Sequence, residues 1–443
     1  MKKKKQRRGI SAGTLIMLLL TVTVLAACGL FMAMIAGETL RSRAGDVVEM
    51  VEQAGLTLMS EAESALLREE ERRGSVQQTA MPQRTQESAA PAAKEQGATT
   101  FTIAAAGTVI APKAVRSGAM SESGEYSFEA VFAGLGGALE KADLAIATLE
   151  TTTAGEKKGY GNHNAPPALL DALRGCGIDV LSLGTERALD KGYDGLEITI
   201  GELTARGIAH TGAAVGESSG AATIGSIGGV QVAVLGYTYG LSSEGKESAS
   251  LSEQDAVAML SAQRMEEDIR QARADGANVV IVLPHWGTKN KQETPDEVKK
   301  LARTLAEAGA DVIFGTHPNV VQGTERLKVT RADGLEYETV VCYSLGSLLN
   351  DARTEENTAG MIAHLSVTYD PAARRVTLGS LACSPVYIAQ QREEGQNVFR
   401  VIDVENEDAM RTLTESEQAQ AHNAAQRVRE VTGQSRMEDE GQG

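Results

Sequence analysis

The sequence predicts an α/β fold in which helices cover both faces of a sheet. Between residues 101 and 314, short apolar runs bounded by turn residues alternate with amphipathic, helix-like stretches. Continuous apolar strands are typical of sheets that are buried on both faces. Hydrophobic residues make up 42% of the 443 residues but aromatic residues only 4%, so the predicted core must consist of Ala, Val, Ile and Leu.

The N-terminus predicts a membrane anchor. Residues 1–8 form a basic stub, and Gly9 to Gly37 is uncharged, mostly apolar and longer than the roughly 20 residues that a membrane-spanning helix needs. A basic flank on one side places the N-terminus in the cytoplasm and the rest of the chain outside it. Two alternatives stay open: lipid attachment at Cys28, which ends a lipoprotein-like Leu-Ala-Ala-Cys sequence, and a cleaved signal peptide.

The next segment, residues 38–100, is predicted to hold a charged juxtamembrane helix followed by a disordered linker rich in Gln, Ala, Ser, Thr and Pro. Residues 101–404 form the predicted folded domain. Its first apolar runs are Phe101 to Gly107, Asp143 to Leu149, Ile178 to Leu183, Val230 to Tyr237, Asn278 to Leu283 and Asp311 to Phe314. The helix-like stretches between them are Ala168 to Arg174, Gly195 to Ala205, Met265 to Asp275 and Asp296 to Ala308.

After Glu336 the pattern changes to strands of alternating polarity, which predict an antiparallel continuation packed on the first part. These strands are Tyr337 to Leu345, Met361 to Tyr369, Arg375 to Leu381, Val386 to Gln390 and Val398 to Val404. Residues 405–443 are predicted to form a polar helix and a tail. The whole chain carries 59 acidic and 43 basic residues, a formal charge of −16, so no nucleic-acid partner is expected.

Polar side chains follow five of the apolar runs. Ligands bind at the carboxyl ends of the strands in open α/β sheets, so these residues are the candidate site. A carboxylate and two imidazoles among them suit a zinc ion. The residues are Thr108, Glu150, Thr185-Glu186-Arg187, His285 and Thr316-His317-Pro318-Asn319.

Five stretches of the chain also resemble a known family. They are Asp143 to Glu150 (DLAIATLE), Ala172 through Gly212, His285-Trp286-Gly287, Glu307 to Gly323 (EAGADVIFGTHPNVVQG) and Tyr343-Ser344-Leu345-Gly346. In this order and spacing they resemble the CapA family, the poly-gamma-glutamate capsule-synthesis group of the calcineurin-like metallophosphatase superfamily. The resemblance implies a four-layer α/β/β/α sandwich with a two-metal site at the strand ends.

The resemblance carries over to single residues only in part. Glu150, His285 and His317 match metal-binding positions of the family, and Asp190 and Gly192 also match. Thr108 replaces the family's first-strand Asp, Thr185-Glu186-Arg187 replaces Asn-Asn-His, and Gly315-Thr316-His317-Pro318-Asn319 replaces Gly-His-His-Pro-His. Two-metal hydrolysis needs enough anionic and imidazole ligands to hold both ions, so a binuclear phosphatase is not expected.

Several roles stay open for these residues. Glu150, His285 and His317 hold at most one divalent ion, zinc or manganese, or they hold none: Glu150 then pairs with Arg187, and the histidines support the loops. Thr108, Thr185, Glu186, Arg187, Thr316 and Asn319 line the predicted pocket, and Trp286 either joins them or packs in the core. The tripeptide Gly161-Asn162-His163 resembles a metallophosphatase motif but is predicted to lie in a surface loop.

These observations lead to three functional hypotheses. The first is a membrane-anchored extracytoplasmic protein of capsule or envelope-polymer synthesis whose domain binds, without catalysis, an anionic polymer or another capsule-synthesis protein. The second is a hydrolase or transferase that acts on envelope polymer with one metal ion or none. The third is a structural protein that oligomerises through residues 38–73.

Overall fold

The computed structural model describes residues 97–161, 163–216, 222–351 and 354–433, all within one compact unit, Val76–Gly443. The basic stub, the predicted anchor, the juxtamembrane helix, the linker up to residue 96 and the last ten residues lie outside the described residues. Within the described ranges, no helix combines the length and apolar character needed to cross a membrane.

The described strands form two sheets. The first has eight strands in the order β14-β13-β12-β1-β2-β3-β4, with β11 paired to β1, and the second has six in the order β5-β6-β7-β8-β10-β9. The first sheet consists of β1 (Thr99–Val109), β2 (Leu144–Leu149), β3 (Val180–Ser182), β4 (Ala209–Thr211), β11 (Ser347–Leu349), β12 (Ala359–Asp370), β13 (Arg375–Glu393) and β14 (Gln396–Asp403). The second consists of β5 (Ala222–Ile227), β6 (Val230–Thr238), β7 (Val279–His285), β8 (Val312–Phe314), β9 (Thr324–Thr330) and β10 (Glu336–Cys342).

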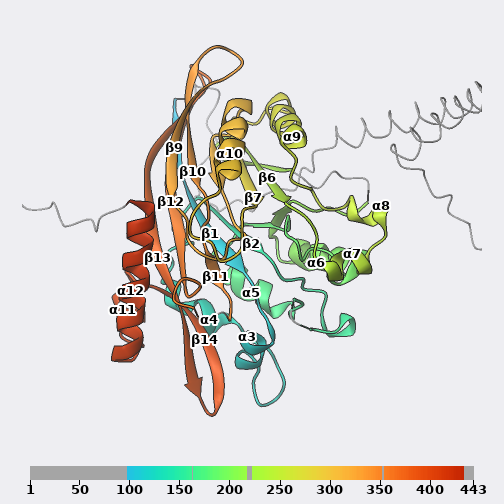
Figure 1. Cartoon of the computed structure of the whole chain (residues 1–443), viewed down its shortest axis with the longest axis vertical. Coiled ribbons are helices and arrows are strands. Elements are labelled where there is room, and N and C mark those ends of the chain that lie inside the picture. Colours follow the sequence, from blue (N-terminus) through green and yellow to red (C-terminus); the bar gives the residue numbers. More distant parts are fainter. Residues whose placement is uncertain (1–96, 162, 217–221, 352–353, 434–443) are drawn as a thin grey trace, which may run out of the picture. The chain divides into compact units, whose positions relative to one another are not determined.

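Helices cover the outer faces of both sheets (Figure 1). On the first sheet they are α3 (Lys113–Gly118), α4 (Glu129–Phe132), the 3-10 turn η1 (Ala133–Leu135), α5 (Ala168–Gly175) and α6 (Gly192–Ala205), with the 3-10 turn η2 (Glu156–Lys158) in a loop. On the second they are α9 (Ala262–Ala274) and α10 (Asp296–Ala308), while α7 (Ser243–Ser248) and α8 (Leu251–Gln254) lie in the β6–α9 connection. The chain ends in α11 (Glu407–Met410) and α12 (Glu415–Thr432).

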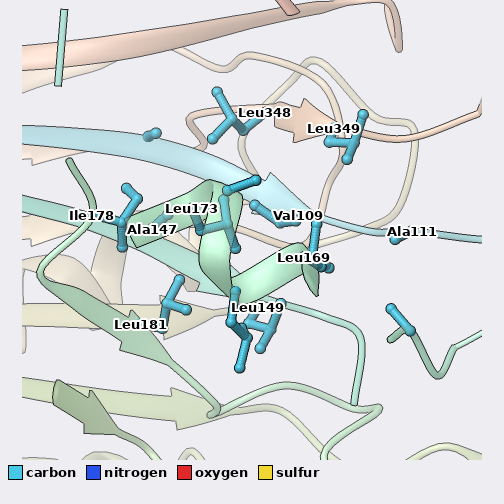
Figure 2. Packing of buried hydrophobic residues seen from close by; sticks show 14 of the residues in the cluster. Val109, Ala111, Ala147, Leu149, Leu169, Leu173, Ile178, Leu181, Leu348 and Leu349 are labelled. Atoms are coloured by element: carbon cyan, nitrogen blue, oxygen red, sulfur yellow. The ribbon is translucent and has the colours of Figure 1, made fainter. Parts of the chain in front are cut away.

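The alternation of side chains along β1 shows how the layers are built. Phe101 and Ile103 point into the cluster between the sheets, whereas Ala104 and Ala106 point to the helices on the outer face. Figure 2 shows this outer cluster, where Leu169 and Leu173 of α5 pack on the sheet. The apolar runs therefore form strands buried on both faces, and the predicted four-layer α/β/β/α order is confirmed.

The C-terminal strands differ from the prediction in two ways. They do not form one antiparallel block, since β12, β13 and β14 extend the first sheet from β1 while β9 and β10 extend the second. Arg375 to Leu381 and Val386 to Gln390, predicted as two strands, belong to the single 19-residue strand β13. Strands β4, β5, β9 and β11 were not predicted.

The C-terminal helix α12 belongs to the folded body. Ala421, Ala424 and Val428 are buried in the cluster between the sheets, and α12 packs on β13 and β12 (Figure 1). The predicted domain ends at residue 404, but in the structure the core continues into this helix.

Glycines bring the two sheets together at the carboxyl ends of their strands. A Cβ atom on Gly184, after β3, would lie 2.7 Å from the backbone N of Tyr237 in β6, and one on Gly212 would overlap the backbone of Gly184. Gly212 also has a φ of +83°, a conformation that side chains disfavour. Backbone therefore contacts backbone here, and residues that follow strands of different sheets become neighbours.

Candidate metal and ligand site

Residues from both sheets meet at this edge. Glu150 follows β2 and Glu186 lies in the loop after β3 of the first sheet, while His285 ends β7 and His317 follows β8 of the second. All four are buried. The prediction that strand-end residues gather at one place therefore describes the observed arrangement, although the set that converges most closely is not the one predicted.

Three donor atoms form a compact triangle. Glu186 Oε2 lies 3.0 Å from His317 Nδ1 and 3.6 Å from His285 Nε2, and the two ring nitrogens are 3.3 Å apart. A tetrahedral zinc ion with ligands at about 2.0 Å separates its ligand atoms by about 3.3 Å. The residues present therefore fit one divalent ion, with three protein ligands and a fourth position left for a ligand or water. Among the described residues, this is the one group of three such donors that could hold a metal ion.

Glu150, predicted as the carboxylate ligand, lies at the edge of this triangle. Its Oε2 is 3.6 Å from His285 Nε2, and neither carboxylate oxygen has a hydrogen-bond partner in the described part of the chain. Burial, and then the charge of Glu186, raise the pKa of Glu150 to about 8. Metal ligands must be deprotonated, so Glu186 is the better carboxylate donor of the two.

The predicted pairing of Glu150 with Arg187 is not formed. Arg187 instead contacts Asp190, with Nη1 3.3 Å from Oδ2, and its Nε lies 3.8 Å from Glu186 Oε1. Ser242 donates a hydrogen bond to the other oxygen of Asp190. The positive charge of Arg187 therefore lies next to Glu186. The carboxylate of Asp190 neutralises this charge.

The two histidines of the second sheet differ in their local structure: His285 contacts a side chain, and His317 has an unusual backbone angle. Thr316 Oγ1 lies 3.0 Å from His285 Nδ1, which leaves Nε2 facing Glu186. His317 has a φ of +97°, outside the usual range for a side chain of its size. Backbone strain of this kind is often found at functional sites. Thr316, predicted to line the pocket, therefore acts by orienting a donor.

Tyr239 is a site residue that the sequence analysis missed. Its hydroxyl donates to Glu186 Oε2 over 2.8 Å, and its ring centroid lies 4.5 Å from that of His317. The residue directly follows β6 and is 52% exposed, so its ring forms part of the outer boundary of the site. The rule that found the other residues, inspection of each strand end, would also have found Tyr239.

Burial and neighbouring polar groups determine the protonation of Glu186 and His285. Burial alone would raise the pKa of Glu186, but the neighbouring imidazoles of His285 and His317 and the hydrogen bond from Tyr239 hold it well below its ordinary value. Burial lowers the pKa of His285 to about 4, although Glu186 partly opposes this shift. Glu186 is thus ionised and His285 neutral at pH 7, the forms that bind a metal ion.

The other predicted pocket residues supply no atom to the donor triangle. Thr108 in β1, Thr185 after β3 and Asn319 after β8 are buried, and each has a side-chain oxygen without a hydrogen-bond partner among the described residues. Trp286 is 2% exposed, packs in the cluster under α9 and α10, and donates from Nε1 to Tyr343 O over 2.9 Å. Its contacts are those of a packing residue.

His163, assigned from the sequence to a surface loop, is only partly a surface residue. It is half-buried, and its Nδ1 is shielded from solvent. A cavity of about 930 Å³ lies elsewhere, on the outer face of β12 and β13, where His364, Ser366 and Asp403 line it. That cavity shares no residue with the strand-end site.

Comparison with known proteins gives a family match. Residues 79–352 match the family model described as "Bacterial capsule synthesis protein PGA_cap". The PGA biosynthesis protein CapA of Bacillus subtilis (strain 168) is 29% identical over 181 residues, 40% of this chain and 44% of the relative. The capsule biosynthesis protein CapA of Bacillus anthracis is 25% identical over 193 residues, 42% of this chain and 44% of the relative. The chain thus matches less than half the length of either relative.

Solved structures that are similar to this chain include a putative 5'-nucleotidase from Staphylococcus aureus in complex with alpha-ketoglutarate. It has a TM-score of 0.39 and 11% identity, with 74% of this chain and 58% of that chain covered. The calcineurin-like phosphoesterase YfkN from Bacillus subtilis has a TM-score of 0.38 and 14% identity, with 74% and 99% covered.

Proposed function

Because the chain belongs to the bacterial capsule synthesis protein PGA_cap family, we propose that it acts in the synthesis of a capsule or cell-envelope polymer of the poly-gamma-glutamate type. Its folded domain lies outside the cytoplasm, anchored by the apolar segment Gly9 to Gly37, and binds an anionic polymer segment at the strand-end site. The resemblance to the CapA family that the motifs predicted is confirmed. The membrane anchor and the binding role remain proposals.

The observation that carries the proposed role of the site is the donor triangle. Glu186, His285 and His317 supply one carboxylate and two imidazoles at separations that suit one zinc or manganese ion. A bound ion would supply positive charge and one open coordination position, at which an oxyanion binds. The residues of the chain would orient the ion and the polymer, with Thr316 and Tyr239 fixing the donors.

The second candidate is an envelope-polymer hydrolase or transferase with a single metal ion. The open fourth position favours it, because catalytic zinc sites commonly combine three protein ligands with one exchangeable ligand. Glu150 is the side chain placed to exchange a proton there, since it is buried beside His285 with a raised pKa. This candidate predicts turnover of polymer, whereas the first predicts binding alone.

Metal content tests the proposed site. We expect about one zinc or manganese ion per full-length chain after purification with the metal supplied, measured by elemental analysis. Replacing Glu186 by Gln removes an anionic donor and is expected to weaken metal binding by at least tenfold. Glu150→Gln is the matched control, since a neutral amide resembles the protonated carboxyl, and it should retain the ion.

Three outcomes would contradict this assignment. Two metal ions per chain would indicate a binuclear site. The absence of bound metal would indicate that the site works without a metal ion. Loss of metal in Glu150→Gln but not in Glu186→Gln would restore the ligand set first predicted from the sequence.

A further inference from the structure

One aromatic ring lies on the solvent side of the donor triangle. The ring centroid of Tyr239 is 4.5 Å from that of His317 and 6.3 Å from that of His285. The two imidazoles are 5% and 0% exposed respectively, whereas Tyr239 is 52% exposed. The tyrosine ring is therefore the part of this group of three rings that a ligand arriving from solvent meets first.

The exposure of this ring is unusual for the protein. Aromatic residues make up only 4% of the chain, and Tyr239 is the one exposed aromatic residue among those that the structure describes. Trp286, which follows His285 directly, is buried in the core instead. Aromatic side chains commonly line ligand sites, so a single exposed ring beside the donors indicates contact with a ligand.

The Tyr239 side chain is held at both of its ends. At the backbone, Tyr239 N donates to His285 O over 3.1 Å, and the preceding Thr238 N donates to Ala258 O over 2.9 Å. At the tip, the hydroxyl donates to Glu186 Oε2 over 2.8 Å. The ring therefore has a defined position, and little conformational freedom is lost when a ligand packs on it.

The Tyr239 hydroxyl also fixes the direction of the Glu186 carboxylate. Oε2, which accepts its hydrogen bond, is the oxygen that lies 3.0 Å from His317 Nδ1 and 3.6 Å from His285 Nε2. Arg187 Nε approaches the other oxygen, Oε1, at 3.8 Å. One oxygen of the carboxylate is thus directed at the imidazoles, and hydrogen bonds to a ligand residue are what orient it for a metal ion.

The chemistry of a suitable ligand follows from this arrangement. An anionic group bound at the donor triangle brings the chain that carries it next to the exposed part of the Tyr239 ring. An apolar segment of that chain gains by covering the ring, because both surfaces then leave water. Each unit of a γ-linked glutamate polymer combines a carboxylate with a short methylene chain, which is this combination of groups.

We propose that Tyr239 is the specificity residue of the strand-end site: its hydroxyl positions Glu186 for the metal ion, and its ring binds the methylene segment of a carboxylate polymer. This inference deepens the proposed function and rests on it for the nature of the polymer. The ring distinguishes a carboxylate on an aliphatic chain from a carboxylate without one, a difference to which the metal donors are indifferent.

Two substitutions separate the hydroxyl from the ring. Tyr239→Phe removes only the hydroxyl, and Tyr239→Leu removes the ring as well. The zinc affinity of the full-length chain, measured by competition with a chelator, should fall about tenfold in both variants, because the hydrogen-bond partner of a metal ligand is lost in each.

Tyr337→Leu is the matched control for these variants. Tyr337 also donates from its hydroxyl to a carboxylate, Asp333 Oδ2, over 2.6 Å, but it lies at the amino end of β10. The strand-end site lies at the carboxyl ends of the strands, so Tyr337→Leu should bind zinc and the polymer as the wild type does.

Calorimetric titration of the zinc-saturated full-length proteins tests the ring, with a γ-linked glutamate oligomer and acetate as probes. Tyr239→Phe keeps the ring and should bind the oligomer within about threefold of the wild type. Tyr239→Leu should bind the oligomer about tenfold more weakly than Tyr239→Phe, because leucine offers less apolar surface for contact than a flat ring. Acetate has no methylene chain, so its affinity should be the same in both variants.

The outcomes distinguish failure of this inference from failure of the proposed function. Equal oligomer affinities in Tyr239→Phe and Tyr239→Leu, or an equal loss for acetate, overturn the role of the ring, and wild-type zinc affinity in Tyr239→Phe overturns the role of the hydroxyl. A zinc-loaded wild type that binds acetate but no oligomer overturns the proposed polymer and the role of the ring together. Oligomer binding that depends on the ring in a chain without zinc supports the ring and removes only the metal site.

Discussion

The histidines of this protein differ in role because their neighbours differ. His285 and His317 lie against Glu186, while His163 is half-buried in the loop after β2. His210, in β4, is 2% exposed, and neither of its ring nitrogens has a hydrogen-bond partner among the described residues. A buried imidazole without a partner resists protonation, and burial lowers the pKa of His210 to about 4.

His210 should make folding sensitive to acid. Its pKa is about 4 in the folded chain and about 6.5 when unfolded, so between these values the unfolded chain binds a proton that the folded chain does not. The free energy of unfolding therefore falls as pH falls, by about 2 kcal/mol between pH 7 and pH 5 from this residue. In urea unfolding at the two pH values, His210→Leu should lose that part of the decrease.

The exposed His422 supplies the control for this experiment. His422→Leu should keep the full pH dependence of the wild type. If His210→Leu also kept it, burial of the His210 ring would not be the cause.

At the scale of elements, the sequence predicts best the strands that consist of continuous apolar runs. The runs that became β1, β2, β6 and β7 were found because most of their side chains are buried, and those of β2 and β7 all are. Strands β4 and β9 were missed for physical reasons: β4 has only three residues, and β9 alternates buried with exposed side chains at the edge of its sheet. Their positions depend on pairing with strands distant in sequence.

The location of the candidate site could be predicted from the sequence, but its carboxylate ligand could not. Strand ends located Glu150, Glu186, His285 and His317, because the carboxyl ends of parallel strands share one edge. The choice between Glu150 and Glu186 depends on side-chain directions after the strand, which the sequence pattern does not contain. The family motifs favoured Glu150 for the same reason. A motif gives the position of a residue along the chain, but it does not give the direction of the carboxylate oxygens.

Helix α12 should be sensitive to side-chain size on its buried face. Ala424 is fully buried against the sheet, so Ala424→Leu adds volume to a packed interface and should lower the free energy of unfolding by about 1–3 kcal/mol. Ala419→Leu, on the exposed face of the same helix, should change it by less than about 0.5 kcal/mol. Thermal unfolding of both variants measures the difference, and equal effects would mean that α12 does not pack as observed.

At the scale of the whole molecule, the site exists because two sheets approach each other. Glu186 belongs to the first sheet and His285 and His317 to the second, so the donor triangle spans the interface. The glycine contacts after β3 and β4 set the separation of the sheets there. Metal binding should therefore depend on residues that never touch the metal.

Gly212→Ala tests this dependence. The substitution forces a side chain into a left-handed conformation against the Gly184 backbone, and it should destabilise the fold by at least about 2 kcal/mol. Because it displaces one sheet relative to the other, we also expect metal affinity to fall about tenfold in the variant that remains folded. Equilibrium dialysis of the metal measures this change.

Gly201→Ala is the matched control. Gly201 lies in the exposed interior of α6 with nothing near its missing Cβ, so alanine should stabilise the helix by up to about 1 kcal/mol. Its metal affinity should equal that of the wild type. Unchanged affinity in folded Gly212→Ala would show that sheet separation does not control the site.

Trp286 gives the molecule an optical property. It is the single tryptophan of 443 residues, it follows His285 directly, and it is enclosed with one hydrogen bond to Tyr343 O. The indole fluorescence of the entire chain therefore originates at one buried position next to His285 of the candidate site. A metal ion that quenches fluorescence and is bound by His285 would lower the entire tryptophan emission. The emission intensity would therefore report whether the site is occupied.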